Sequence, residues 1–93
     1  MDINEHEALG HLRLANVLVV RSDLNQAREH YERAIALRPT LSQAHLNLVR
    51  VLNALGDDQR TLAAARLWLR YFPSDPRPRQ LILELDPTLR RAR

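Results

Sequence analysis

Apolar and polar residues recur with a helical period over most of the chain, most clearly between positions 24 and 38. The apolar positions there fall on one stripe, whose members are Leu24, Ala27, Tyr31, Ala34 and Ile35. Charged residues occupy the opposite face, as in an amphipathic helix that packs on a partner. Pro39 disfavours helical geometry at the residue before it, so this helix is expected to end near Arg38.

The segment before this helix carries apolar residues on two adjoining helical faces. One face holds Leu9, Leu12, Ala15 and Val19, and the other holds Leu14, Val17 and Leu18. A helix with so wide an apolar surface is expected to be covered on more than one side. Arg21-Ser22-Asp23 ends it, and Asp23 is predicted to cap the next helix.

A second hairpin follows Pro39. Thr40 is a candidate cap for its first helix. The apolar stripe of that helix consists of Leu41, Ala44, Leu48, Val51, Leu52 and Leu55. Gly56 suits the left-handed position after a helix, and Asp57 can cap the return helix, which Pro73 closes.

A short fifth helix is predicted after this hairpin. Asp75 can cap its start, and Pro76 suits its first turn. Its apolar residues are Leu81, Ile82, Leu83 and Leu85. Asp86-Pro87 breaks this helix. Taken together, the five predicted helices make the chain almost wholly α-helical.

Core and turn positions recur at a fixed offset along the chain. Pro39 and Pro73 are 34 positions apart (73 − 39). Six further pairs are identical at this offset: His11 and His45, Leu12 and Leu46, Leu14 and Leu48, Val17 and Val51, Leu18 and Leu52, and Asp23 and Asp57. A period of this length in helix–turn–helix form is that of tetratricopeptide repeats.

Over about residues 8–85 the chain resembles the tetratricopeptide repeat family. The first repeat carries the family's pattern at His11, Leu14, Ala15, Leu18, Ala27, Tyr31, Ala34 and Pro39. The second carries it at His45, Leu48, Val49, Leu52, Thr61 and Pro73, but Ala65 replaces a large residue and Trp68 a small one. The resemblance implies one all-α domain, a superhelix of antiparallel hairpins. Its parts would be repeat one at about 8–41, repeat two at about 42–75, a capping helix at about 76–86 and a basic tail at 87–93.

The resemblance also implies a scaffold that binds a protein or peptide in the groove lined by the first helices, without catalysis or a cofactor. The residues expected to line this groove are Leu9, Leu12, Asn16, Val19, Gln43, Leu46, Asn47, Arg50, Asn53, Arg77 and Gln80. The surface is apolar at one end and carries Arg and Asn at the other. It would suit a peptide with an apolar anchor and a carboxylate.

One subgroup of the family clamps acidic C-terminal peptides of chaperones between basic and Asn side chains. The matching places here are Leu12, Asn16, Asn47, Arg77 and Leu81. The two asparagines and Arg77 fit this pattern, whereas Leu12 and Leu81 do not. Ordinary solvated Asn and Arg side chains are the alternative interpretation.

An excess of apolar residues near the C-terminus predicts a second kind of contact. Leu67, Trp68, Tyr71, Leu81 and Leu83 exceed what one stripe buries. Either further repeats of a parent protein cover them, or the module forms a homodimer through its C-terminal helices. A self-associating structural or assembly module is therefore the alternative function.

Composition and charge exclude several other classes of protein. The chain has 93 residues, no Cys and no apolar run near the roughly 20 residues of a membrane span, which predicts a single cytoplasmic domain. A parent protein could nevertheless carry an export signal.

The acidic residues outnumber Arg by 8 to 6 in residues 1–59, and Arg outnumbers them by 8 to 3 in residues 60–93. Nucleic acid is not the expected partner, because few aromatic residues remain for base stacking, although phosphates could be neutralised by Arg77, Arg79, Arg90, Arg91 and Arg93.

Catalytic and metal-binding patterns fail on spacing. His6 and His11 are five residues apart, whereas a zinc protease helix needs its histidines four apart. His11 and His45 also occupy packing positions of the repeat. The chain has only Gly10 and Gly56, which excludes a glycine-rich phosphate loop. No enzymatic activity is therefore expected.

Overall fold

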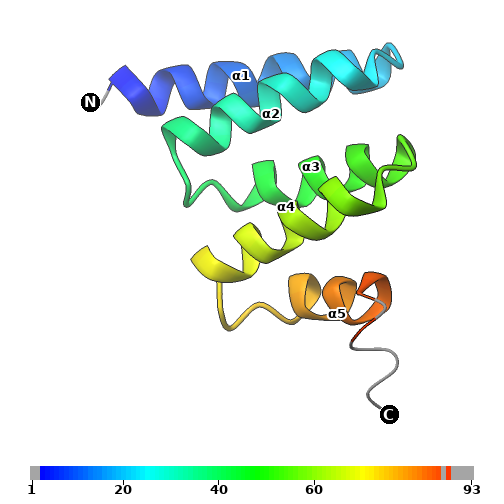
Figure 1. The fold of residues 1–93 in the computed structure, drawn as a ribbon. Coiled ribbons are helices and arrows are strands. Elements are labelled where there is room, and N and C mark those ends of the chain that lie inside the picture. The colour runs from blue at the N-terminus through cyan, green and yellow to red at the C-terminus, as the bar shows by residue number, and fades with distance from the viewer. Residues whose placement is uncertain (1–2, 87, 89–93) are drawn as a thin grey trace.

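The computed structural model describes residues 3–86 and 88, and it is all-α over this part of the chain (Figure 1). Its helices are α1 (Ile3–Val20), α2 (Leu24–Leu37), α3 (Ser42–Ala54), α4 (Asp58–Tyr71) and α5 (Pro76–Leu85). None of the described residues belongs to a β-strand. The predicted fold class is confirmed in this respect, and the predicted basic tail lies almost entirely outside the described residues.

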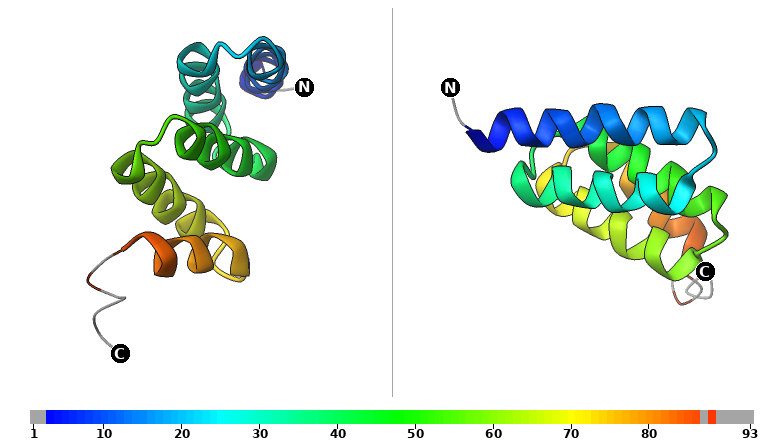
Figure 2. Two further views of the ribbon diagram at one scale, coloured as in Figure 1. Left: turned by 90° about the vertical axis from the view of Figure 1, so that its right-hand side faces the viewer. Right: turned by 90° about the horizontal axis from the view of Figure 1, so that it is seen from above.

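Successive helices pack on one another as a stack of hairpins. In Figure 1, α2 and α4 lie in front of α1 and α3, and the view from above in Figure 2 agrees. Helix α4 is offset from α2 by the same interval at its start and at its end, since 58 − 24 equals 71 − 37. This interval is also the one that separates Pro39 from Pro73. The period of the sequence is therefore also the period of the helices.

Most helix ends follow the turn chemistry predicted for them. Gly56 has φ +74°, and the Asp57 carboxylate accepts a hydrogen bond from the Arg60 N–H at 3.0 Å. The Asp75 carboxylate accepts one from the Arg77 N–H at 3.0 Å, next to Pro76 in the first turn. These contacts satisfy amide groups that a helix start otherwise leaves without partners.

Two predicted caps differ from the structure. Asp23 precedes α2, but its side chain makes no capping hydrogen bond. The residue before α3 is Leu41 rather than Thr40, because Thr40 belongs to the turn and Leu41 packs partly against the core. Ser22 has φ +66°, the left-handed conformation that Gly56 adopts at the equivalent place one repeat later.

The core combines small residues at close helix contacts with a few large side chains. Tyr31 and Trp68, each 1% exposed, are its largest fully buried members. Ala15, Ala27, Ala34, Ala44 and Ala65 are completely buried between helices. Burial of Tyr31 was predicted from its place on the α2 stripe and is confirmed.

Helix α1 departs from its prediction at its outer face. It begins at Ile3, and the Glu5 carboxylate in its first turn accepts a hydrogen bond from Arg38 at 2.9 Å. Leu14 and Val17 were expected to be covered, but they are 45% and 52% exposed. The expectation is wrong because α1 packs chiefly on α2, and the other described helices do not cover its outer face.

Candidate functional site

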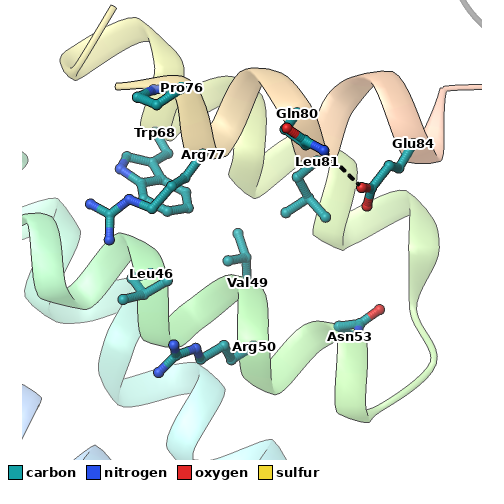
Figure 3. Close-up of a pocket in the computed structure, with 10 residues that line it drawn as sticks. All are labelled: Leu46, Val49, Arg50, Asn53, Trp68, Pro76, Arg77, Gln80, Leu81 and Glu84. Carbon is teal, nitrogen blue, oxygen red and sulfur yellow. Dashed lines mark hydrogen bonds between the residues drawn. The ribbon is translucent and has the colours of Figure 1, made fainter. Parts of the chain in front are cut away.

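A hollow of about 450 Å³ opens between α3 and α5. Its walls are mainly apolar and come from Leu46, Val49, Trp68, Pro76 and Leu81, and its rim carries Arg50, Asn53, Arg77, Gln80 and Glu84. Figure 3 shows Val49 of α3 and Leu81 of α5 pointing toward each other across it. We call this the α3/α5 hollow, and its apolar walls with a polar rim suit an apolar part of a ligand.

Trp68 reaches this hollow from α4 and is 1% exposed. The Arg77 guanidinium lies 5.0 Å from the centre of the indole, within the range of a cation–π contact. Arg77 also binds Asp75 through two nitrogens, with Nη2 2.7 Å from Oδ2 and Nε 3.1 Å from Oδ1. Hydrogen bonding to Arg77 lowers the pKa of Asp75, and the same contact raises the pKa of Arg77. The charge of Arg77 is therefore already compensated.

A smaller hollow of about 190 Å³ lies between α1 and α3. It is lined by Asn16, Val19, Tyr31, Asn47, Arg50 and Val51. The Asn16 Oδ1 accepts hydrogen bonds from the Tyr31 hydroxyl at 2.5 Å and from the Asn47 Nδ2 at 3.1 Å. Burial raises the pKa of Tyr31, which keeps its hydroxyl protonated and able to donate at neutral pH.

The same hydrogen bonds hold the two amides of the α1/α3 hollow in fixed positions. Within the described residues, the Asn16 amide nitrogen and the Asn47 amide oxygen make no hydrogen bond of their own. The α1/α3 hollow therefore offers one donor and one acceptor on neighbouring helices. A peptide group presents the complementary pair, a C=O and an N–H.

Arg50 lines both hollows. It is exposed, and it forms no ion pair with any side chain in the described part of the chain. Its guanidinium lies on the side of α3 that faces away from α5 (Figure 3). A cation without a partner, placed between an apolar hollow and a pair of amides, is a ready site for a carboxylate.

The two hollows contain eight of the eleven residues predicted to line the groove. These are Asn16, Val19, Leu46, Asn47, Arg50, Asn53, Arg77 and Gln80. Leu12 was predicted wrongly: it is 5% exposed and belongs to the core, because the buried face of α1 includes it. Leu9 packs partly against the core, and Gln43 is exposed but lines neither hollow.

Sequence reasoning missed five residues of the α3/α5 hollow as groove residues: Val49, Trp68, Pro76, Leu81 and Glu84. Trp68 and Leu81 were assigned instead to self-association. For Trp68 that assignment is wrong, because α5 and the Arg77 side chain cover its ring within the chain. The apolar residues of positions 81–85 were the signal in the sequence for this cover, since they follow Trp68 on the next helix.

The other residues predicted for self-association lie apart from this hollow. Leu67 lines a depression shared by α2, α3 and α4, and Tyr71 and Leu83 are 42% and 52% exposed. Leu12, which already failed to match the chaperone-peptide clamp because it is not a cation, is also buried in the core.

Two of the histidines form a pair, not a metal site of three or more ligands. The Nδ1 atoms of His11 and His30 lie 2.9 Å apart, so one of the two donates a hydrogen bond to the other across α1 and α2. Burial lowers the pKa of His30, and the neighbouring His11 lowers it further. Among residues 3–86 and 88, no three His, Asp or Glu side chains gather as metal ligands would.

Comparison with known proteins adds no family assignment, because neither a protein-family model nor a curated protein matches the chain. The structure contributes one further fact about membranes. In the part of the chain that it describes, every helix is too short or too polar to cross a bilayer.

Proposed function

We propose that the chain is a helical-repeat scaffold of the tetratricopeptide type, and that the surface formed by α1, α3 and α5 binds a peptide or a protein segment. The recurrence of helix starts and ends at one interval, from α2 to α4, supports the repeat. The single observation that carries the binding proposal is the position of Arg50. It lies without an ionic partner where the two hollows meet, within the described residues.

The expected ligand is an extended segment with an apolar side chain next to a carboxylate. The apolar side chain enters the α3/α5 hollow and contacts Val49, Trp68 and Leu81. The carboxylate binds Arg50, and the following peptide group meets the amides of Asn16 and Asn47. The polar groups of this surface are exposed or half-buried, and its apolar walls, which are buried or half-buried, are reached through the α3/α5 hollow.

The expected affinity is modest. Burying one Leu-sized side chain contributes about 1.5–3 kcal/mol, and a hydrogen bond to a charged group contributes about 1.5–3 kcal/mol. Together these give roughly 3–6 kcal/mol, which corresponds to dissociation constants from about 6 millimolar to tens of micromolar. A short peptide should therefore bind weakly, and a longer segment along the groove more tightly.

The proposal can be tested without knowing the natural partner. Peptides would be selected from a random display library on the wild-type chain, and their affinities measured by fluorescence anisotropy. Arg70 on α4 is a matched control, because it is exposed and makes no ion pair within the described residues.

Selected sequences are expected to share an apolar residue near Asp or Glu. Their affinity should fall about tenfold or more with Arg50→Ala and remain unchanged with Arg70→Ala, since a charge-assisted hydrogen bond contributes about 1.5–3 kcal/mol. Equal binding by both variants, or a library that yields no such peptides, would reject the groove as the binding surface.

A further inference from the structure

The outer face of α1 carries apolar residues of the kind that the repeat buries elsewhere. Leu14 and Val17 are 45% and 52% exposed. Their equivalents one repeat later, Leu48 and Val51, are 5% and 3% exposed. Two positions that are core in the second hairpin are therefore uncovered in the first.

These two residues belong to a narrow stripe along α1 and the turn after it. Its members are separated by three and four residues, and all are exposed: Glu7, Gly10, Leu14, Val17 and Arg21. This is the spacing of a seam between two packed helices. The stripe has an acid near its start, a base at its end and apolar residues between them.

The two charges of the stripe have no partners within the described residues. Neither Glu7 nor Arg21 takes part in an ion pair there. Glu7 lies seven residues before Leu14 (14 − 7), and Arg21 lies seven residues after it (21 − 14). Each charge is therefore about 10 Å from Leu14 along the helix, at 1.5 Å per residue.

We propose that this stripe is a self-association surface, on which α1 of a second copy packs antiparallel about a two-fold axis beside Leu14. The symmetric spacing of the charges supports this occupant and this direction. An antiparallel copy places Glu7 opposite Arg21 of the partner subunit at both ends. A parallel copy would instead place Glu7 opposite Glu7 and Arg21 opposite Arg21, which is unfavourable.

The middle of the stripe fits the same arrangement. In the antiparallel register, Leu14 contacts its own counterpart. Val17 lies within one residue of the level of Gly10 of the partner subunit, since the two are three and four residues from Leu14. A Cβ atom built on Gly10 would have no neighbouring atom within 4 Å, so the space above this glycine is open to a partner's side chain. The twofold relation is also the commonest symmetry of homo-oligomers.

This surface is separate from the proposed groove. Asn16 is two residues from Leu14, about 200° around the helix, and it lines the α1/α3 hollow on the other side. A single pair of 18-residue helices buries less area than a standard stable interface. The dimer is therefore expected to be weak, with a dissociation constant on the order of 10⁻⁴ M.

Analytical ultracentrifugation of the full chain, from about 10 µM to 1 mM, tests the surface. Val17 and Leu83 form a matched pair of variants, because both are 52% exposed and lie on different helices. Val17→Asp should weaken the wild-type dimer at least tenfold, and Leu83→Asp should leave it unchanged. Circular dichroism would verify that both variants fold.

Two results would overturn the proposal. The first is a wild-type chain that stays monomeric at millimolar concentration. The second is a dimer that Leu83→Asp abolishes and Val17→Asp does not, which would place the contact on the C-terminal helices instead.

Charge exchange tests the antiparallel direction separately. Glu7→Arg alone and Arg21→Glu alone should each weaken the dimer, because each creates two like-charged pairs. The double variant should restore it, and an equimolar mixture of the two single variants should form heterodimers. If the double variant remains as weak as the single ones, the antiparallel arrangement is wrong.

Discussion

Replacing Tyr31 by alanine is expected to lower the free energy of unfolding by about 3–5 kcal/mol, the usual cost of removing a buried aromatic ring. Tyr31 is 1% exposed and packs in the core that α1, α2 and α3 share. A chain of 93 residues has a total stability of roughly 5–14 kcal/mol, at about 0.05–0.15 kcal/mol per residue. The substitution should therefore remove a large share of the stability.

The hydroxyl and the ring of Tyr31 can be measured separately. Tyr31→Phe removes the hydroxyl, with its 2.5 Å hydrogen bond to the Asn16 Oδ1 and its contact with the Asn47 side chain. The Asn16 Oδ1 also accepts from Asn47, so it keeps one partner after the change. Tyr31→Phe is expected to lower the free energy of unfolding by about 1 kcal/mol. Packing of the ring accounts for the rest of the loss expected for Tyr31→Ala.

Urea titration followed by circular dichroism and by Trp68 fluorescence measures both losses. Trp68 is the sole tryptophan and is buried in the second hairpin, so coincident transitions would also show that the two hairpins unfold together. Tyr71→Ala is the control, because the same side chain is 42% exposed there, and it should cost less than about 1 kcal/mol. The packing argument is refuted if Tyr31→Ala costs no more than Tyr71→Ala.

The remaining predictions concern the turns and pH. Gly56 and Ser22 have φ +74° and +66°, so Gly56→Ala should cost about 1 kcal/mol and Ser22→Gly should add up to about 0.5 kcal/mol in thermal unfolding. If Gly56→Ala and Ser22→Gly changed the stability in the same direction, this interpretation of the two turns would be wrong. Burial lowers the pKa of His45 below its ordinary 6.5, and its Nε2 donates a hydrogen bond to the Pro39 carbonyl at 2.7 Å. As pH falls, His45 takes up a proton in the unfolded chain before it does so in the folded chain. The contribution of His45 to the free energy of unfolding is therefore fully present above pH 6.5 and is lost below it, toward the folded-state pKa. Urea titrations at about pH 7 and pH 5 measure how much the free energy of unfolding falls between the two pH values. The fall should be larger for the wild-type chain than for His45→Gln, and an equal fall would exclude His45 as the cause.

The helices and most of their ends could be predicted because their causes are local. The stripe through Tyr31 follows from the 3.6-residue period, and the left-handed turn at Gly56 follows from the missing side chain. The start of α3 could not be predicted in the same way. Leu41, not Thr40, is the residue before α3, and Leu41 packs partly against the core. That contact involves residues distant in the sequence, so local turn chemistry does not reveal it.

The candidate site was predictable only in part, since the spacing of residues within one helix does not show where its neighbours lie. Helical position groups Leu12 with Asn16, yet Leu12 is buried and Asn16 reaches the α1/α3 hollow. Trp68 was assigned to a contact with further repeats or with a second copy, but α5 and Arg77 cover it within the chain. The exposed face of α1 was missed for the same reason, because its apolar pattern is that of a covered helix.

Amide chemical-shift mapping by NMR tests the proposed groove most directly. A selected peptide would be titrated into the ¹⁵N-labelled chain, and shift changes would be followed for residues of every helix. The proposal predicts that the largest changes cluster around Arg50, Asn53 and Gln80 on α3 and α5, and extend to Asn16 on α1. Changes concentrated on the outward residues of α2 and α4, such as Glu29 and Arg70, would contradict it.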